Sequence, residues 1–169
     1  MKKQGFGMWL SLLAIIAAVV AFVIFGQVIV AGDMLTIANG SEPFYNSSLE
    51  SYTNMVETVN LCAIAGMAAL AVAILLGQFQ NKFFNIVVGI VRIAIPVLFM
   101  VALLSFLEGS FTGLGWTFFS NEELEIFAEA IAVGEQTFIG LIAFAAAMVL
   151  SIFASFFAIS KKVAKKVED

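Results

Sequence analysis

The sequence predicts an all-α membrane protein, a bundle of four transmembrane helices with both termini in the cytoplasm. Two observations predict the bundle: 62% of the 169 residues are hydrophobic, and most of these fall into four long blocks. A helix needs ~20 apolar residues to cross ~30 Å of hydrocarbon, and its backbone must pair within the segment. We therefore expect one integral membrane domain over residues 1–169, with spans at about 8–30, 57–78, 83–107 and 136–160.

The first predicted span follows two lysines, Lys2 and Lys3, as the core of a secretory signal would. Its apolar run is longer than the ~7–15 residues of a typical signal core. We therefore expect residues 8–30 to remain as a membrane span rather than to be cleaved.

The lysines predict how the chain is threaded. They precede the first span, separate the second from the third, and follow the fourth: Lys2, Lys3, Lys82, Lys161, Lys162, Lys165 and Lys166. The two remaining connections, residues 31–56 and 108–135, contain acidic residues but no Lys or Arg. Because basic loops stay inside, we expect a multi-pass protein of the plasma or inner membrane with both termini cytoplasmic.

The second extracytoplasmic loop, residues 108–135, is expected to contain a short amphipathic acidic helix. Ser120 and Glu123 have the spacing of a capping box, and Gly134 is suited to end the helix. The simpler interpretation is a lid that shields the ends of the spans. The alternative is a docking surface for an extracytoplasmic partner.

Small residues suggest how the spans associate, because helices in lipid pack through small side chains and interhelical hydrogen bonds. The second span carries them at every fourth position: Ala65, Ala69, Ala73 and Gly77. The first and fourth spans carry similar sets: Ala14, Ala17, Ala18 and Ala21, then Gly140, Ala143 and Ala147. We expect these faces to pack within the bundle, and a seam for another subunit or a second copy is the alternative.

One polar residue from each span is expected at a similar depth near the outer surface. These residues are Gln27, Asn60, Ser105 and Thr137, with Glu57 one turn from Asn60. Mutual hydrogen bonds of ~0.6 kcal/mol each would hold the helices together. The alternative is the floor of an outward-facing pocket.

Arg92 is the one arginine of the chain, and it lies inside the third predicted span. Asn85 lies on the same helical face nearer the cytoplasm, and Pro96 removes the N–H that would bond the carbonyl of Arg92. Ser151 and Ser155 of the fourth span have comparable depth. Because a central arginine costs ~2.5–3.5 kcal/mol, we expect its side chain to reach toward the interface as a structural feature. The alternative is an anion or lipid-headgroup site open to the cytoplasm.

Groups that support catalysis are scarce. The chain has no histidine, and Cys62 is its single cysteine. The spans therefore offer neither a base beside a nucleophile nor a set of metal ligands. We expect no enzyme activity, no cofactor and no metal, and nothing in the sequence predicts nucleic-acid binding.

The sequence thus favours a non-enzymatic structural or accessory subunit that associates in the lipid bilayer with other membrane or extracytoplasmic proteins, or with copies of itself. The alternative function is a small transporter or channel component in which Arg92 attracts an anion from the cytoplasm.

Overall fold

The computed structural model describes residues 5–34, 43–46, 48–79, 82–119 and 128–157. These residues form four long α-helices: α1 (Phe6–Met34), α2 (Glu50–Leu76), α3 (Lys82–Phe119) and α4 (Ala128–Phe156). Each helix contains a segment that is long and apolar enough to cross a membrane. The architecture is therefore that of an all-α, multi-pass membrane protein.

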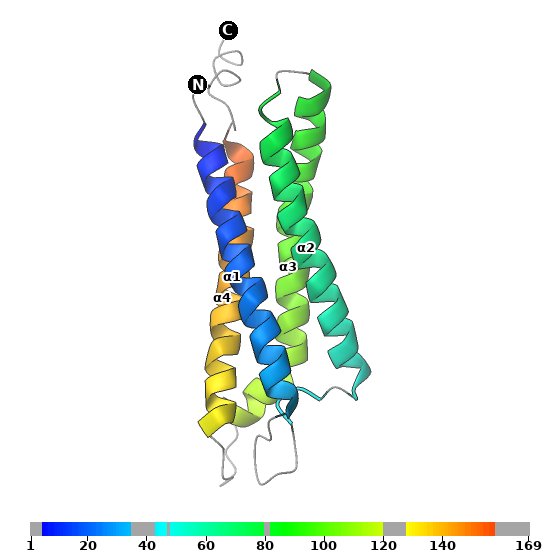
Figure 1. Cartoon of the computed structure of the whole chain (residues 1–169), viewed down its shortest axis with the longest axis vertical. Helices are drawn as coiled ribbons and strands as arrows, with labels where there is room; N and C mark the ends of the chain where they lie inside the picture. Colours follow the sequence, from blue (N-terminus) through cyan, green and yellow to red (C-terminus); the bar gives the residue numbers. More distant parts are fainter. Residues whose placement is uncertain (1–4, 35–42, 47, 80–81, 120–127, 158–169) are drawn as a thin grey trace.

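The helices run alternately up and down along one axis (Figure 1). α1 packs mainly against α4, α2 packs mainly against α3, and α3 joins the two pairs by packing against α4. α1 and α2 contact each other least of the neighbouring pairs. The start of α1, the end of α2, the start of α3 and the end of α4 lie at one end of the bundle, which we call the terminal end. The other end, where Glu50 begins α2, we call the acidic end.

The helices extend beyond the spans expected from hydropathy, mostly at the acidic end. α2 begins at Glu50 rather than near residue 57, α3 continues to Phe119, and α4 begins at Ala128. Much of the expected loop 108–135 is therefore helical. Residues 120–127, where the separate acidic helix was expected to begin, lie outside the described residues. Gly134, its expected end, lies inside α4.

Small residues form the contact between α1 and α4. Ala14, Ala18 and Ala21 of α1 are completely buried, as is Ala147 of α4. Gly140 of α4 is also buried, against Ile24 of α1. Small side chains let two helix backbones approach closely, which is how helices gain packing energy in lipid. The small-residue faces of these two helices are thus used within the chain.

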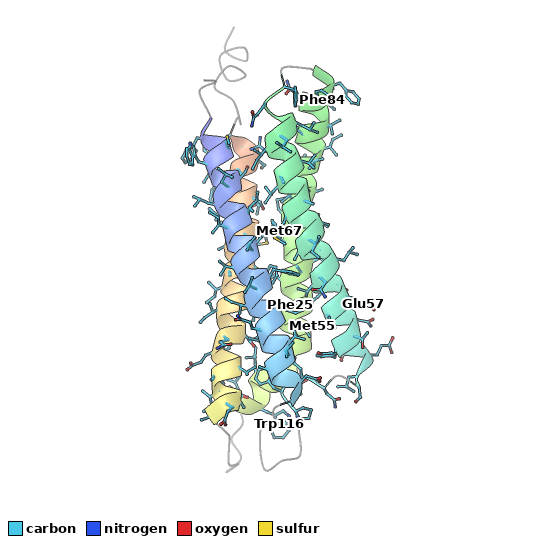
Figure 2. All side chains as sticks on the ribbon, in the orientation of Figure 1. Phe25, Met55, Glu57, Met67, Phe84 and Trp116 are labelled. Carbon is cyan, nitrogen blue, oxygen red and sulfur yellow. The ribbon has the colours of Figure 1, made fainter. Side chains whose placement is uncertain are left out.

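Aromatic rings fill the centre of the half nearer the acidic end. Phe25, Phe106 and Phe144 come from α1, α3 and α4, and all three are buried. Phe106 packs edge-to-face on both partners, with ring centroids 5.0 Å from Phe25 and 6.3 Å from Phe144. Such edge-to-face pairs add to the packing energy of the rings. Figure 2 shows Phe25 pointing into the bundle.

Candidate functional site

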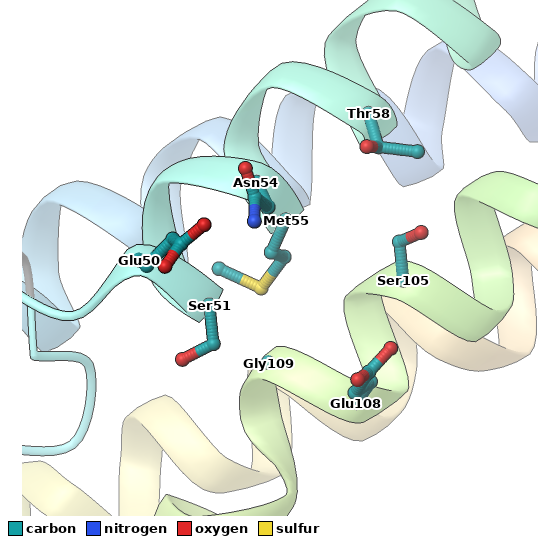
Figure 3. A pocket seen from close by; sticks show the side chains of 8 residues that line it. All are labelled: Glu50, Ser51, Asn54, Met55, Thr58, Ser105, Glu108 and Gly109. Carbon is teal, nitrogen blue, oxygen red and sulfur yellow. The ribbon is translucent and has the colours of Figure 1, made fainter.

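A polar groove opens between α2 and α3 at the acidic end of the bundle (Figure 3). Its cavity has a volume of about 360 Å³. Eight residues line it: Glu50, Ser51, Asn54, Met55, Thr58, Ser105, Glu108 and Gly109. The lining combines two carboxylates with hydroxyl and amide groups, so the groove can accept and donate hydrogen bonds and attract a positive charge.

Helical spacing explains why these side chains meet. Glu50, Asn54 and Thr58 recur at four-residue steps and therefore lie on one face of α2. Across the groove, Ser105 and Glu108 project from α3, three residues apart. Between the two faces, Met55 is buried against Gly109, where any side chain would collide with its sulfur. Gly109 thus lets Met55 close the bottom of the groove.

Charge is distributed unevenly along the bundle. The acidic groups of the described residues are carried by Asp33, Glu50, Glu57, Glu108, Glu129 and Glu135, all in the half nearer the acidic end. Arg92, the basic group whose side chain the structure describes, lies toward the terminal end. The groove therefore lies in a negative field that favours a cationic ligand or partner.

The structure disperses the five residues of the expected outer polar layer. Ser105 lines the groove, whereas Thr137 is completely buried on the other side of α3 and hydrogen bonds elsewhere. Asn60 is half-buried, and Gln27 is exposed. Glu57 is exposed as well and points away from the bundle (Figure 2). Their positions along the predicted spans put these residues at similar depths, but they could not show which face of its helix each residue occupies.

Tyr45 forms a buried polar cluster that the sequence did not predict. It lies in the short described segment 43–46, yet only 1% of its surface is exposed. Its hydroxyl is 3.0 Å from both Ser110 Oγ of α3 and Thr137 Oγ1 of α4. Its backbone N–H donates to the carbonyl of Gly32 in α1 over 3.1 Å. This one residue thus connects three helices, and its only sequence signal is an apolar Pro-Phe-Tyr stretch within a polar loop.

The cluster has fewer protons than hydrogen-bond contacts. Ser110 Oγ also lies 2.6 Å from the carbonyl of Phe106, and Thr137 Oγ1 lies 2.8 Å from the carbonyl of Val133. Three hydroxyl groups supply three protons, while four contacts connect them to each other and to the carbonyls. Because Ser110 and Thr137 donate to the carbonyls, Tyr45 can donate to only one of the two hydroxyls, and its contact with the other lacks a proton.

Burial also makes this phenol hard to ionise. It raises the pKa of Tyr45 from its ordinary value of 10.0 to about 12, because the charged form would be desolvated. The hydrogen bonds from Ser110 and Thr137 act in the opposite direction but are smaller effects. Tyr45 is therefore neutral at physiological pH and acts as a structural hydrogen-bonding group.

Arg92 reaches the end of a neighbouring helix. Its Nη2 donates to the carbonyl oxygen of Phe157, the residue after α4, over 2.8 Å. The last carbonyls of a helix have no donor within the helix and carry partial negative charge. A guanidinium at this position satisfies one such carbonyl and interacts favourably with the helix dipole.

The other residues of the expected intramembrane site are arranged differently. Ser151 and Ser155 donate within α4, to the carbonyls of Met148 and Ile152. Asn85 is exposed, and α3 continues without interruption through Pro96. Arg92 is thus brought to the end of α4 rather than to the serine hydroxyls.

Within the described ranges, no three His, Cys, Asp or Glu side chains are grouped so that they could hold a metal ion. Cys62 is buried in α2 as a free thiol.

Comparisons with protein families, with curated proteins and with solved structures found no match to this chain.

Proposed function

We propose that the protein is a non-enzymatic accessory subunit of a membrane assembly, and that it binds a partner protein at the polar groove between α2 and α3. The observation that supports this proposal is a groove of about 360 Å³, lined by two carboxylates, on the flank of the α2–α3 pair. The partner would offer a basic residue to Glu50 and Glu108.

The surroundings of the groove make a partner favourable. Leu61 of α2 and Leu104 and Leu107 of α3 lie within one or two turns of it and are exposed. Contact with lipid is favourable for these leucines. It is unfavourable for the hydroxyls of Thr58 and Ser105 at the inner end of the groove, because polar groups that face hydrocarbon lose their hydrogen bonds with water. A polar partner segment would satisfy both the hydroxyls and the carboxylates.

Electrostatics favours a cationic contact. The described part of the acidic end contains carboxylates but no basic side chain. A basic residue in the groove would therefore meet complementary charge without competition from this part of the chain, which supports both association rate and specificity.

A photo-crosslinking amino acid at Asn54 in the full-length protein tests the proposal in membranes of the native host. We expect one stoichiometric partner to be trapped from Asn54, which lines the groove, and not from Thr53, which is exposed on the same helix but does not line the groove. Glu50→Gln with Glu108→Gln should weaken recovery of the partner about tenfold, which corresponds to ~1.4 kcal/mol.

The conditions for rejecting this assignment are specific. Equal trapping from positions 54 and 53, or unchanged recovery after both charges are removed, would refute the groove as the binding site. A thermal-unfolding measurement on the double variant shows whether the fold is retained.

Transport of an anion through an Arg92 site is the second function that the sequence suggested. The guanidinium already donates to the end of α4, so its position has a structural explanation, and we do not adopt transport as our proposal. If the protein is an accessory subunit, the purified protein alone in liposomes should not conduct an anion. A flux that disappears in Arg92→Gln would favour transport instead.

A further inference from the structure

Arg92 occupies a position of α3 that faces the other helices. Val88, four residues before it, and Ile95, three residues after it, are 6% and 1% exposed. Residues at these steps share one face of a helix, so Arg92 continues the stripe by which α3 packs on its neighbours. A guanidinium therefore stands where the packing pattern would otherwise have an apolar side chain.

The bundle is stepped at this position. The end of α2 and the start of α3 extend past the start of α1 and the end of α4 in Figure 1. Arg92 follows Lys82, the first residue of α3, by ten residues, or about 15 Å of helical rise. Because it bonds the carbonyl of Phe157, its guanidinium lies in the corner between the side of α3 and the end of α4.

The charge in this corner has no counter-ion among the described residues. Their carboxylates all lie in the other half of the bundle. The carbonyl of Phe157 is a dipole, and it engages one of the five N–H donors of the guanidinium. A half-buried cation with donors to spare requires an anion or water for the others.

We propose that Arg92 binds the phosphate group of a phospholipid in this corner. The forked N–H groups of a guanidinium match two phosphate oxygens, and charge-assisted hydrogen bonds of this kind are stronger than those between neutral groups. The same end of the bundle carries exposed aromatic side chains: Phe6 and Trp9 of α1 and Phe156 of α4. Tryptophan is enriched at the level of the lipid headgroups. Phe6 packs edge-to-face on Phe157, at 5.0 Å, beside the carbonyl that positions Arg92.

This inference is independent of the proposed partner, because the groove and the corner lie in opposite halves of the bundle. The recognised chemistry is a phosphate monoanion or diester, which either a lipid headgroup or free inorganic phosphate could supply.

Native mass spectrometry of the full-length protein, purified in mild detergent, tests the proposal. We expect the wild type to retain a phospholipid through delipidation, and Arg92→Gln to retain it about tenfold less often. Arg92→Lys keeps the charge but loses the forked donors, so its lipid retention should lie between that of the wild type and that of Arg92→Gln. Ser155→Ala is the matched control, since its hydroxyl donates within α4 and lipid retention should not change.

Two further measurements keep the test decisive. The first compares the unfolding temperature of the wild type in lipid-free micelles with inorganic phosphate and with chloride. A higher temperature in phosphate would show that the corner also accepts the free anion, and equal temperatures would show that it does not. In labelled wild-type protein in bilayers, a carbon–phosphorus dipolar coupling between Arg92 Cζ and phosphate should be detected even if Arg92→Gln fails to fold. Equal lipid retention in wild type and Arg92→Gln, or absence of this coupling, would overturn the proposal.

Discussion

Tyr45 shows how a single loop residue can organise the end of a helical bundle. Its ring is buried beside Gly32, and its hydroxyl connects α3 to α4. Hydropathy and helical periodicity could not predict this role, because a residue outside a regular element has no periodicity to interpret. Arg92 is the opposite case, since its type and depth made it prominent in the sequence. Its actual acceptor, the backbone carbonyl of the residue that follows α4, depends on where that helix ends.

Ionisation of Tyr45 should weaken the fold at high pH. The unfolded side chain ionises near its ordinary pKa of 10.0, whereas the buried one has a pKa of about 12. The unfolded state therefore loses its proton first, and the stability contributed by the neutral phenol, complete below pH 10, is lost as the pH rises toward 12.

Unfolding temperatures of wild type and Tyr45→Phe, followed in detergent from neutral to alkaline pH, test this coupling. At neutral pH, Tyr45→Phe should cost only about 1 kcal/mol, because Ser110 and Thr137 keep their carbonyl acceptors. Above pH 10 the wild type should lose stability more steeply than the variant. Parallel curves would show that Tyr45 is not the group responsible.

The four helices were predictable from the sequence, whereas their ends were not. Long apolar blocks identify membrane helices because lipid offers the backbone no other partner. Beyond Leu107, glycines and aromatics in α3 resemble a loop in composition, yet the helix continues to Phe119. Tertiary packing overrides propensity here: Gly113 is buried against Phe44, and Gly109 lies in close contact with Met55. The polar groove follows from the same extension, since Glu108 and Gly109 line it only as part of the helix.

Two glycines of α1 provide a matched test of this close packing. A Cβ at Gly32 would collide with the ring of Tyr45, whereas a Cβ at Gly26 would meet nothing within 4 Å. Gly32→Ala should therefore destabilise the protein by ~1–3 kcal/mol through overpacking. Gly26→Ala should be neutral or stabilise it by up to ~1 kcal/mol, because alanine is the better helix former. Chemical denaturation in mixed micelles measures both, and equal effects would mean that Tyr45 does not pack on α1 as described.

The whole bundle has a strong charge polarity along its axis. Its described carboxylates lie in one half, and Arg92 lies toward the terminal end. The sequence predicts the orientation of this axis through lysines such as Lys161 and Lys162, although most of them lie outside the described residues. The relative placement of the helices, by contrast, required the structure, because hydropathy does not specify which pairs pack.

Labelling of single cysteines in intact cells tests the orientation. We replace Cys62 with Ala and introduce either Ser48→Cys, at the acidic end, or Lys166→Cys, near the C-terminus. A membrane-impermeant thiol reagent should modify position 48 and leave position 166 unmodified until the cells are permeabilised, because basic segments remain inside. Modification of position 166 from outside would reverse the threading.

The strong pairing of α1 with α4 has a consequence for biogenesis. Of the four described helices, the one synthesised first finds its principal neighbour in the one synthesised last. Until α4 has been synthesised, the buried alanine face of α1, Ala14, Ala18 and Ala21, must remain in contact with lipid or with the insertion machinery. A nascent chain released before α4 would expose this adhesive face, so premature termination should yield a product that the cell's quality-control proteases recognise.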